Sequence, residues 1–189
     1  MTTDPPGAQN ARAREQRLDA LYAAHGRSVL AYAVRRAADE HDAADVLAET
    51  FVVAWRRLDD IPSGDQALMW LYAVARRILA NQKRGERRRQ RLAERLGREL
   101  VSALETVAPS EPAALPIFAA LAGLGPDDRE IVLLAAWEEL SPQQIGAVLG
   151  ITQIAARSRL HRARKRLRAL LDHPAEIDGV DQLNIQEAV

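Results

Sequence analysis

Apolar residues recur at the spacing of an α-helix through most of this 189-residue chain. One such stripe contains Leu47, Phe51, Ala54, Trp55 and Leu58. A second stripe, within residues 68–79, repeats the pattern. This period requires a helix with one buried face, and the strict alternation of a half-buried strand is absent from the sequence. We therefore predict an all-α fold, which excludes architectures built on a sheet.

Prolines divide the helical pattern into two parts. Pro109, Pro112 and Pro116 lie close together and cannot all sit inside one helix. We predict two small helical domains joined by a flexible linker, with a loop at residues 59–66 inside the first domain. The predicted segments are a flexible N-terminal arm at 1–17, a first domain at 18–96, the linker at 97–116, a second domain at 117–171 and an acidic C-terminal tail at 172–189.

Helix start and stop signals lie close together between residues 141 and 170. Ser141 can cap a helix whose first position suits Pro142, and Gln144 completes a capping box. Gly150 can adopt the left-handed conformation that ends a helix, and Thr152 can cap the next one. A short helix, a tight glycine turn and a longer helix together form a helix-turn-helix.

The second helix of this motif carries a polar and basic face opposite its apolar stripe. An α-helix fits the major groove of B-DNA, where an arginine can bind guanine O6 and N7 with two hydrogen bonds. We predict that this face binds duplex DNA; the simpler alternative is a helical hairpin with a solvated basic surface. The candidate residues are Gln153, Arg157, Ser158, His161, Arg162 and Lys165.

Charges are segregated along the chain, although 26 Lys and Arg balance 26 Asp and Glu. Residues 83–98 include eight basic and two acidic residues, and residues 157–168 include seven basic and no acidic residues. Residues 39–49 and 172–189 each include five acidic residues and no Lys or Arg. Two basic and two acidic surfaces indicate more than one kind of partner.

Residues that carry chemistry are too scattered to suggest an active site. The chain has no Cys, which excludes disulfides and thiolate sites, and its four His show no metal-ligand spacing. No Gly-rich phosphate loop is present. No apolar run approaches the roughly 18–20 residues of a membrane span, and residues 1–17 lack a signal-peptide core. We predict a non-enzymatic protein without a metal or cofactor.

Several motifs, in order along the chain, resemble one family. Residues 124–131, 140–151 and 157–167 resemble region 4 of bacterial sigma factors of the extracytoplasmic-function type, group IV of the sigma-70 family. Residues 42–55 resemble the helix with which these factors bind core RNA polymerase. Residues 70–89 resemble the helix that recognises the promoter −10 element. The resemblance covers about residues 18–171 and implies a region 2 helical bundle followed by a region 4 helix-turn-helix.

The chain departs from the family pattern at a few positions. Ala48 stands where the family usually has Gln, Arg77 where it has Asn, and Asn81 where it has Asp. Ile154, Ala155 and Ala156 replace a small residue, Thr and Val at the start of the recognition helix. These differences leave the class intact and bear on the promoter sequence and on the affinity for polymerase.

The resemblance implies a sigma factor that binds core RNA polymerase and directs initiation through the −10 and −35 elements. The implied polymerase-binding residues are Asp42, Asp45, Val46, Leu47 and Glu49. The implied −10 residues, which include the loop that holds a flipped base, are Asp60, Ser63, Trp70, Arg76, Arg77, Asn81, Lys83 and Arg84. The −35 residues are the six already named on the outward face of the second helix.

Structural alternatives compete with some of these roles. Acidic residues at 39–42 also suit a helix N-terminus, because its dipole favours negative charge. We expect Phe51 and Trp55 to be core residues and Tyr72 to pack in the interior, whereas Arg87–Arg89 can be a solvated helix end. The acidic tail can screen the basic helix, but a solubilising end is the simpler interpretation.

The implied partners are promoter DNA, the clamp helices of the largest polymerase subunit and the flap of the second-largest subunit. An anti-sigma factor is left open as a further partner, membrane insertion is not expected, and the expected location is the bacterial cytoplasm, at the nucleoid when active. Two other functions stay open. One is a one-component helix-turn-helix repressor, and the other is a polymerase-bound regulator that does not open promoters.

Overall fold

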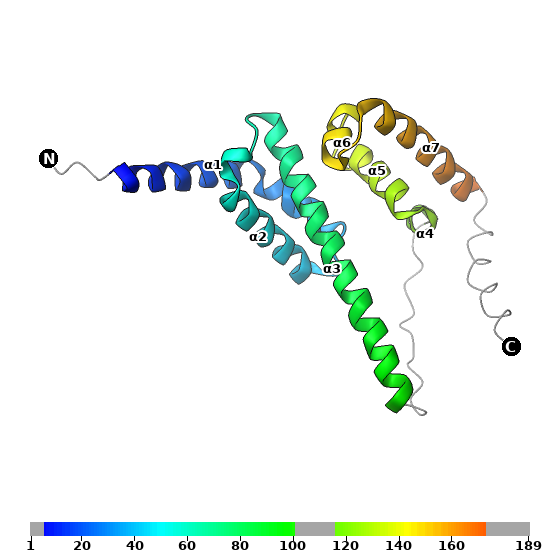
Figure 1. Ribbon diagram of the computed structural model, residues 1–189. Helices are drawn as coiled ribbons and strands as arrows, with labels where there is room; N and C mark the ends of the chain where they lie inside the picture. The colour runs from blue at the N-terminus through cyan, green and yellow to red at the C-terminus, as the bar shows by residue number, and fades with distance from the viewer. Residues whose placement is uncertain (1–5, 101–115, 173–189) are drawn as a thin grey trace. The chain divides into compact units, whose positions relative to one another are not determined.

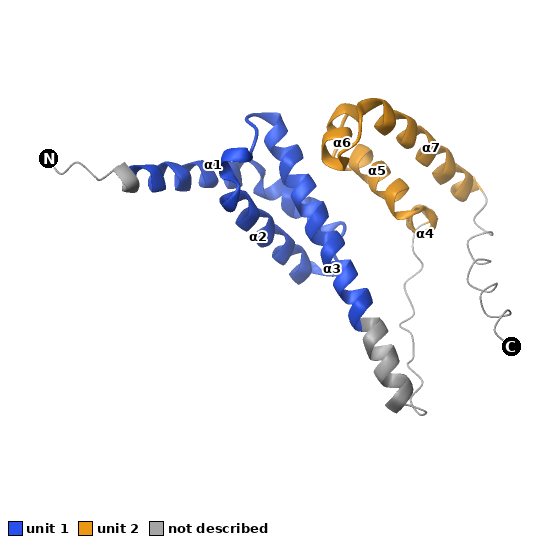
Figure 2. Ribbon diagram, in the orientation of Figure 1, with its two compact units in different colours: residues 1–104 blue, residues 105–189 orange. Residues whose placement is uncertain are grey.

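Helices make up the regular structure of residues 6–100 and 116–172, the residues that the computed structural model describes (Figure 1). Within these two ranges no strand occurs, which confirms the all-α prediction. The chain separates into two units, residues 1–104 and residues 105–189 (Figure 2). Most of the predicted linker and all but the first residue of the acidic tail lie outside the described residues.

Residues 6–100, the described part of the first unit, form a bundle of three α-helices. They are α1 (Pro6–Val34), α2 (Glu40–Arg56) and α3 (Asp65–Leu100), and each packs against the other two. A short 3-10 helix, η1 (Leu58–Asp60), joins α2 to α3. The core contains the fully buried side chains of Val29, Tyr32, Leu58 and Leu71. The rings of Tyr32 and Tyr72 lie 4.9 Å apart, so the expected packing role of Tyr72 is confirmed.

Local signals define both ends of α2. The Oδ1 atom of Asp39 accepts a hydrogen bond from the backbone N–H of Asp42 at 2.8 Å and so caps the helix. This bond satisfies one of the N–H groups that a helix start leaves without a partner. After η1 the chain turns at Gly64, whose φ of 64° lies in the left-handed region, and α3 begins at the next residue. The loop predicted at 59–66 is therefore mostly a 3-10 turn and a tight glycine turn.

The first helix begins at Pro6, inside the range 1–17 that the sequence predicts as a flexible arm. Two arginines attach this part of α1 to the rest of the unit. Arg14 forms an ion pair with Asp59 at 2.8 Å and donates to the carbonyl oxygen of Trp55 at 3.1 Å. Arg17 donates to the carbonyl oxygen of Ile61 at 3.1 Å. These partners lie more than forty residues away, so the local apolar pattern does not reveal them.

The described part of the second unit, residues 116–172, contains four helices. They are α4 (Pro116–Gly123), α5 (Pro126–Ala136), α6 (Pro142–Leu149) and α7 (Gln153–Asp172). The long helix α7 packs against the other three and buries Ala156, Leu160 and Ala163. Among the described residues of this unit, the fully buried large side chains are Ile131 and Leu134 of α5 and Ile145 of α6. Among those same residues, no helix has the length and apolar character needed to cross a membrane.

Candidate polymerase and promoter interfaces

Capping interactions and glycines build the turn between α6 and α7. The Ser141 side chain accepts from the Gln144 backbone N–H, and the Gln144 side chain accepts from the Ser141 backbone N–H, so the predicted capping box is present. Gly150 has a φ of 69°, as its predicted role requires. Thr152 Oγ1 accepts from the backbone N–H of Ala155 at 3.2 Å and caps α7. The predicted helix-turn-helix is therefore confirmed in its local detail.

A further glycine allows the turn to pass close to α6. A Cβ atom on Gly146 would lie 2.7 Å from the carbonyl oxygen of Ile151, closer than such atoms approach. The backbone N–H of Ile151 also donates to the carbonyl oxygen of Gly146 at 3.0 Å. Sequence reasoning does not single out Gly146, because its constraint comes from a contact that forms only once the turn has folded.

The outward face of α7 is polar, basic and free of the unit's core. All six predicted −35 residues are exposed: Gln153, Arg157, Ser158, His161, Arg162 and Lys165. Two other arginines turn toward α5 instead. Arg159 lies 3.7 Å from Asp127, and Arg166 forms an ion pair with Asp128. The arginines of α7 therefore include two that pair with carboxylates of α5 and others that are exposed to solvent.

One face of α3 groups four of the eight predicted −10 residues. Trp70, Arg77, Asn81 and Arg84 follow each other at intervals of seven, four and three, which places them on one side of the helix. Trp70 is half-buried, with the Arg57 guanidinium 5.9 Å from its ring, and Arg84 donates to Asn81. Arg76 and Lys83 lie on the neighbouring side of α3, with Lys83 exposed and Arg76 half-buried.

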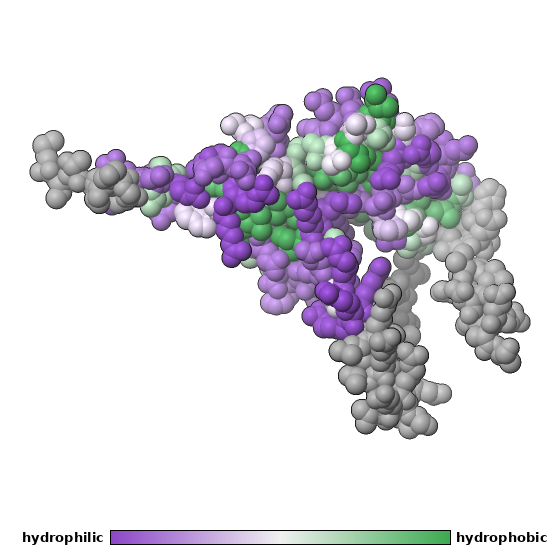
Figure 3. All heavy atoms as spheres, viewed as in Figure 1, coloured by the Kyte–Doolittle hydropathy of each residue, from purple (hydrophilic) through white to green (hydrophobic). Residues whose placement is uncertain are grey.

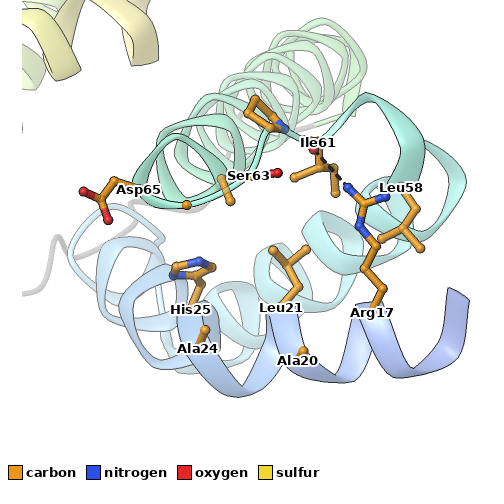
Figure 4. A pocket seen from close by; sticks show the side chains of 12 residues that line it. Arg17, Ala20, Leu21, Ala24, His25, Leu58, Ile61, Ser63 and Asp65 are labelled. Atoms are coloured by element: carbon orange, nitrogen blue, oxygen red, sulfur yellow. Dashed lines mark hydrogen bonds between the residues drawn. The ribbon is translucent and has the colours of Figure 1, made fainter. Parts of the chain in front are cut away.

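A cavity of about 390 Å³ opens between α1 and the segment that leads into α3. Figure 4 shows Leu21 and His25 on the α1 side and Ser63 and Asp65 on the other, with Arg17 bound to the carbonyl oxygen of Ile61. Ser63 is one of the predicted −10 residues. Asp60 is another, but it does not line the cavity; it forms an ion pair with Arg57 at 2.9 Å.

The residues that α1 contributes to the cavity wall are not predicted from the sequence. It includes Arg17, Ala20, Leu21, Ala24 and His25. The sequence places these residues in or beside an ordinary helical stripe, and only the packing of α1 on the η1 segment brings them to the loop. No local motif marks them.

The acidic face of α2 presents part of the predicted polymerase-binding set. Asp45 and Glu49 are exposed, whereas Asp42 and Leu47 are half-buried. Val46, also predicted as a docking residue, is fully buried in the bundle and presents no surface to a partner in this structure. Its side chain occupies the stripe of α2 that faces the core, one residue away from Leu47.

Two aromatic residues of α2 differ from each other in their environment. Phe51 is buried and its ring lies 4.9 Å from that of Tyr22, which confirms the expected core position. Trp55 is also expected in the core, but 37% of it is exposed. The guanidinium of Arg14 lies 5.3 Å from the Trp55 ring and covers part of it. The early start of α1 supplies this cover.

No metal site is evident in the part of the chain that the structure describes. Within residues 6–100 and 116–172, no group of three or more His, Asp or Glu is placed to hold a metal ion. The predicted site residues that are exposed or half-buried lie on three surfaces: the α2 face, the α3 face with its cavity, and the outward face of α7.

Comparisons with known proteins match both units in order. The profile of sigma-70 region 2 matches residues 21–89, and that of sigma-70 region 4 matches residues 115–167. The RNA polymerase sigma factor CnrH of Cupriavidus metallidurans is 33% identical over 182 residues, which cover 89% of this chain and 94% of CnrH. The extracytoplasmic-function sigma factor SigL of Mycobacterium tuberculosis is 32% identical, over 80% of this chain and 87% of SigL. The chain belongs to the extracytoplasmic-function sigma factors.

Solved structures agree with this assignment. The structure of CnrH in complex with the cytosolic domain of CnrY has a TM-score of 0.59 and 28% identity, and covers 87% of this sigma factor and 94% of that chain. RpoE of Bartonella quintana, solved with the anti-sigma factor NepR, shares the fold with a TM-score of 0.56, 23% identity, and coverage of 87% and 97%. The predicted family and function are confirmed: this sigma factor directs RNA polymerase to promoters. The repressor alternative and the blocking-regulator alternative lose their support.

Proposed function

We propose that the three surfaces of this sigma factor divide the work of initiation among them. The α2 face docks on the clamp helices of the largest polymerase subunit. The α3 face and the adjoining cavity bind the −10 element, and the outward face of α7 reads the −35 element. The observation that carries the proposal is the exposure of all six predicted −35 residues on one face of a capped helix-turn-helix.

The α7 face has the chemistry that major-groove recognition needs. Residues near the N-terminus of a recognition helix contact base edges, which favours Gln153 and Arg157 for base readout. Arg162 and Lys165, further along, suit phosphate contacts that set the position of the helix on the duplex. Arg166 is paired with Asp128 and is therefore a weaker candidate for DNA than its neighbours.

The cavity beside α3 suits a base that leaves the helical stack when a promoter opens. Its volume of about 390 Å³ is enough for a small-molecule ligand, since such sites span roughly 300–1,000 Å³. Ser63 and His25 offer polar groups to the edge of a base, and Leu21 offers an apolar surface. Extruding a base costs a few kcal/mol, which contacts in such a pocket offset. The exposed Arg77, Lys83 and Arg84 would then hold the phosphates of the separated strand.

The α2 face combines charge with a partly exposed apolar residue. Asp45 and Glu49 are exposed and acidic, and Leu47 beside them is half-buried. Opposite charge on the clamp helices would steer association and fix the register, while Leu47 contributes apolar contact. We exclude Val46 from this surface because it is fully buried.

The remaining partners follow from the sigma-factor function. We propose that region 4 also contacts the flap of the second-largest subunit, and that an anti-sigma factor binds this chain, as NepR binds the RpoE of Bartonella quintana. A protein that works on polymerase and chromosomal promoters acts in the bacterial cytoplasm, at the nucleoid while active.

Promoter-dependent transcription with matched variants tests this division of roles. Purified protein is added to core polymerase with genomic fragments of its host, and transcripts and polymerase binding are measured together. Asp45→Lys with Glu49→Lys should weaken polymerase binding, whereas Arg157→Ala should leave it intact and change the preference at one −35 base pair by about 1–3 kcal/mol. Unchanged preference at every −35 position in Arg157→Ala would contradict the assignment of α7.

A further inference from the structure

Ile154 is the most exposed large apolar residue among those that the structure describes. Its relative exposure is 80%, and the next value is 53% for Tyr22. Most residues of this size and chemistry are buried in folded proteins. Packing of the second unit does not explain its position, because Ala156, Leu160 and Ala163 provide the buried face of α7.

The position of Ile154 on α7 is the central feature. It lies in the first turn, directly after the helix start that Thr152 caps. Ser158, His161 and Lys165 follow it at i+4, i+7 and i+11, so all four lie on one face, opposite the buried stripe. Ile154 is thus an isolated apolar residue at the N-terminal end of a polar and basic face. Figure 3 shows apolar atoms at the surface where α6 meets α7.

The major groove contains one apolar group that a side chain can recognise. Thymine presents its C5-methyl there, and the other natural bases present hydrogen-bond donors and acceptors. A methylated cytosine presents the same group at the same ring position. An isoleucine in the first turn of a recognition helix can bury this methyl, whereas Arg157 and Ser158 beside it bind polar edges.

We propose that Ile154 is the contact for a pyrimidine C5-methyl group in the −35 element. The inference rests on the proposed role of α7 in −35 binding and adds a specificity that the polar residues do not provide. Removal of one methyl from such a contact should lower affinity by about fourfold.

Removal of single methyl groups from the DNA tests this contact. The holoenzyme, formed from core polymerase and the full chain, is titrated onto a promoter that it transcribes. Each thymine of the −35 element is replaced in turn by deoxyuridine, which removes only the methyl. At one position the wild-type holoenzyme should lose affinity by about fourfold, while Ile154→Ala should bind both DNAs equally. Ile154→Val, which keeps a branched apolar side chain, should retain most of the sensitivity.

A second series distinguishes the two sources of the methyl group. Placing cytosine at the sensitive position should weaken binding, and 5-methylcytosine there should restore part of it for the wild type but not for Ile154→Ala. Leu171→Ala, at the other end of α7, removes another exposed apolar side chain and should leave the methyl sensitivity unchanged.

The outcomes separate the inference from the function on which it rests. If the holoenzyme discriminates among −35 sequences but ignores every methyl, the role of Ile154 is overturned and that of α7 stands. If Ile154→Ala loses the same affinity on thymine and deoxyuridine DNA, its contact is not with a methyl. If scrambling the whole −35 element has no effect on binding, the proposed function of α7 fails together with the inference.

Discussion

Single glycines in this protein have opposite roles, although they look alike in the sequence. A Cβ on Gly146 would meet the carbonyl oxygen of Ile151 at 2.7 Å, and a backbone atom cannot move away without shifting the turn. Nothing lies within 4 Å of the corresponding position on Gly85, which is inside α3. Substitution by alanine should therefore change the free energy of unfolding in opposite directions at the two sites.

We expect Gly146→Ala to destabilise the second unit by about 1–3 kcal/mol, because the added methyl overpacks the turn between α6 and α7. Gly85→Ala should stabilise the first unit by about 0.5–1 kcal/mol, since alanine has the higher helix propensity. Denaturant unfolding followed by circular dichroism measures both changes. A neutral Gly146→Ala variant would show that the turn relaxes more easily than this geometry implies.

The side chain of Arg129, on α5, donates hydrogen bonds to carbonyl oxygens at the C-terminal end of α4. Its Nε donates to the carbonyl oxygen of Leu121 at 2.6 Å, and its Nη2 donates to those of Ala122 and Leu124. These carbonyls lie at or just after the last turn of α4, where a helix leaves acceptors without partners and favours positive charge. Arg129 therefore satisfies the end of α4 from a position on α5.

We expect Arg129→Met to destabilise the second unit by about 1.5–3 kcal/mol, because it removes charged hydrogen bonds and keeps the length of the side chain. Arg129→Lys should restore part of the loss, since an ammonium retains the charge but not the fork of donors. Thermal unfolding of the full chain provides the measurement. Equal stability of the Met and Lys variants would argue against a role for the charge.

At the scale of elements, the first half of α1 is the clearest case of a segment that distant contacts organise. Arg14 and Arg17 bind Asp59 and the carbonyl oxygens of Trp55 and Ile61, all at the junction of α2 and α3. This junction also forms one wall of the cavity proposed for a flipped base. The start of α1 therefore supports the loop next to the −10 surface.

We expect the double substitution Arg14→Ala and Arg17→Ala to destabilise the first unit by about 1–2 kcal/mol, as partly exposed ion pairs and hydrogen bonds contribute modestly. Promoter opening, followed by permanganate reactivity of unpaired thymines, should fall more than binding of the closed complex. Arg27→Ala, at an exposed position of α1, serves as a control that removes one charge from the same helix. If the double variant opened promoters like the wild type, α1 would not support the loop.

For the whole molecule, the distribution of charge is more informative than the total. Lys and Arg equal Asp and Glu at 26 each, yet 17 of the basic residues lie on α3 and α7, and residues 39–49 include five acidic residues and no Lys or Arg. DNA binding by such a chain is salt-dependent in spite of its neutrality, because each phosphate contact releases condensed counterions.

We expect the logarithm of promoter affinity to fall linearly with the logarithm of salt concentration, and Arg162→Ala to reduce the slope by about one. Arg166→Ala should change the slope less, because Asp128 already pairs with that guanidinium. Filter binding of the holoenzyme between low and moderate salt measures both. Equal slopes for the two variants would show that the ion pair opens on DNA.

Features that depend on contacts between near neighbours can be read directly from the amino-acid order. Three such features are the capping box at Ser141, the left-handed Gly150 and the cap at Thr152. Each involves residues only a few positions apart, so the sequence pattern predicts it. The helical period likewise identified the all-α class and the exposed face of α7. Because the family's motifs recur in both regions and in the right order, the amino-acid order alone was enough to identify a sigma factor.

Three features depend on the packing of helices and are not evident from the sequence: which of two neighbouring apolar residues is buried, where α1 begins and which residues surround the cavity. Val46 and Leu47 are equally plausible as docking residues by type, and the packing of the bundle buries the first and leaves the second partly exposed. Arg14 and Asp59 form an ion pair although they lie 45 residues apart in the sequence. Such contacts depend on how helices pack in space, and a local pattern carries no information about the partner that a side chain will meet.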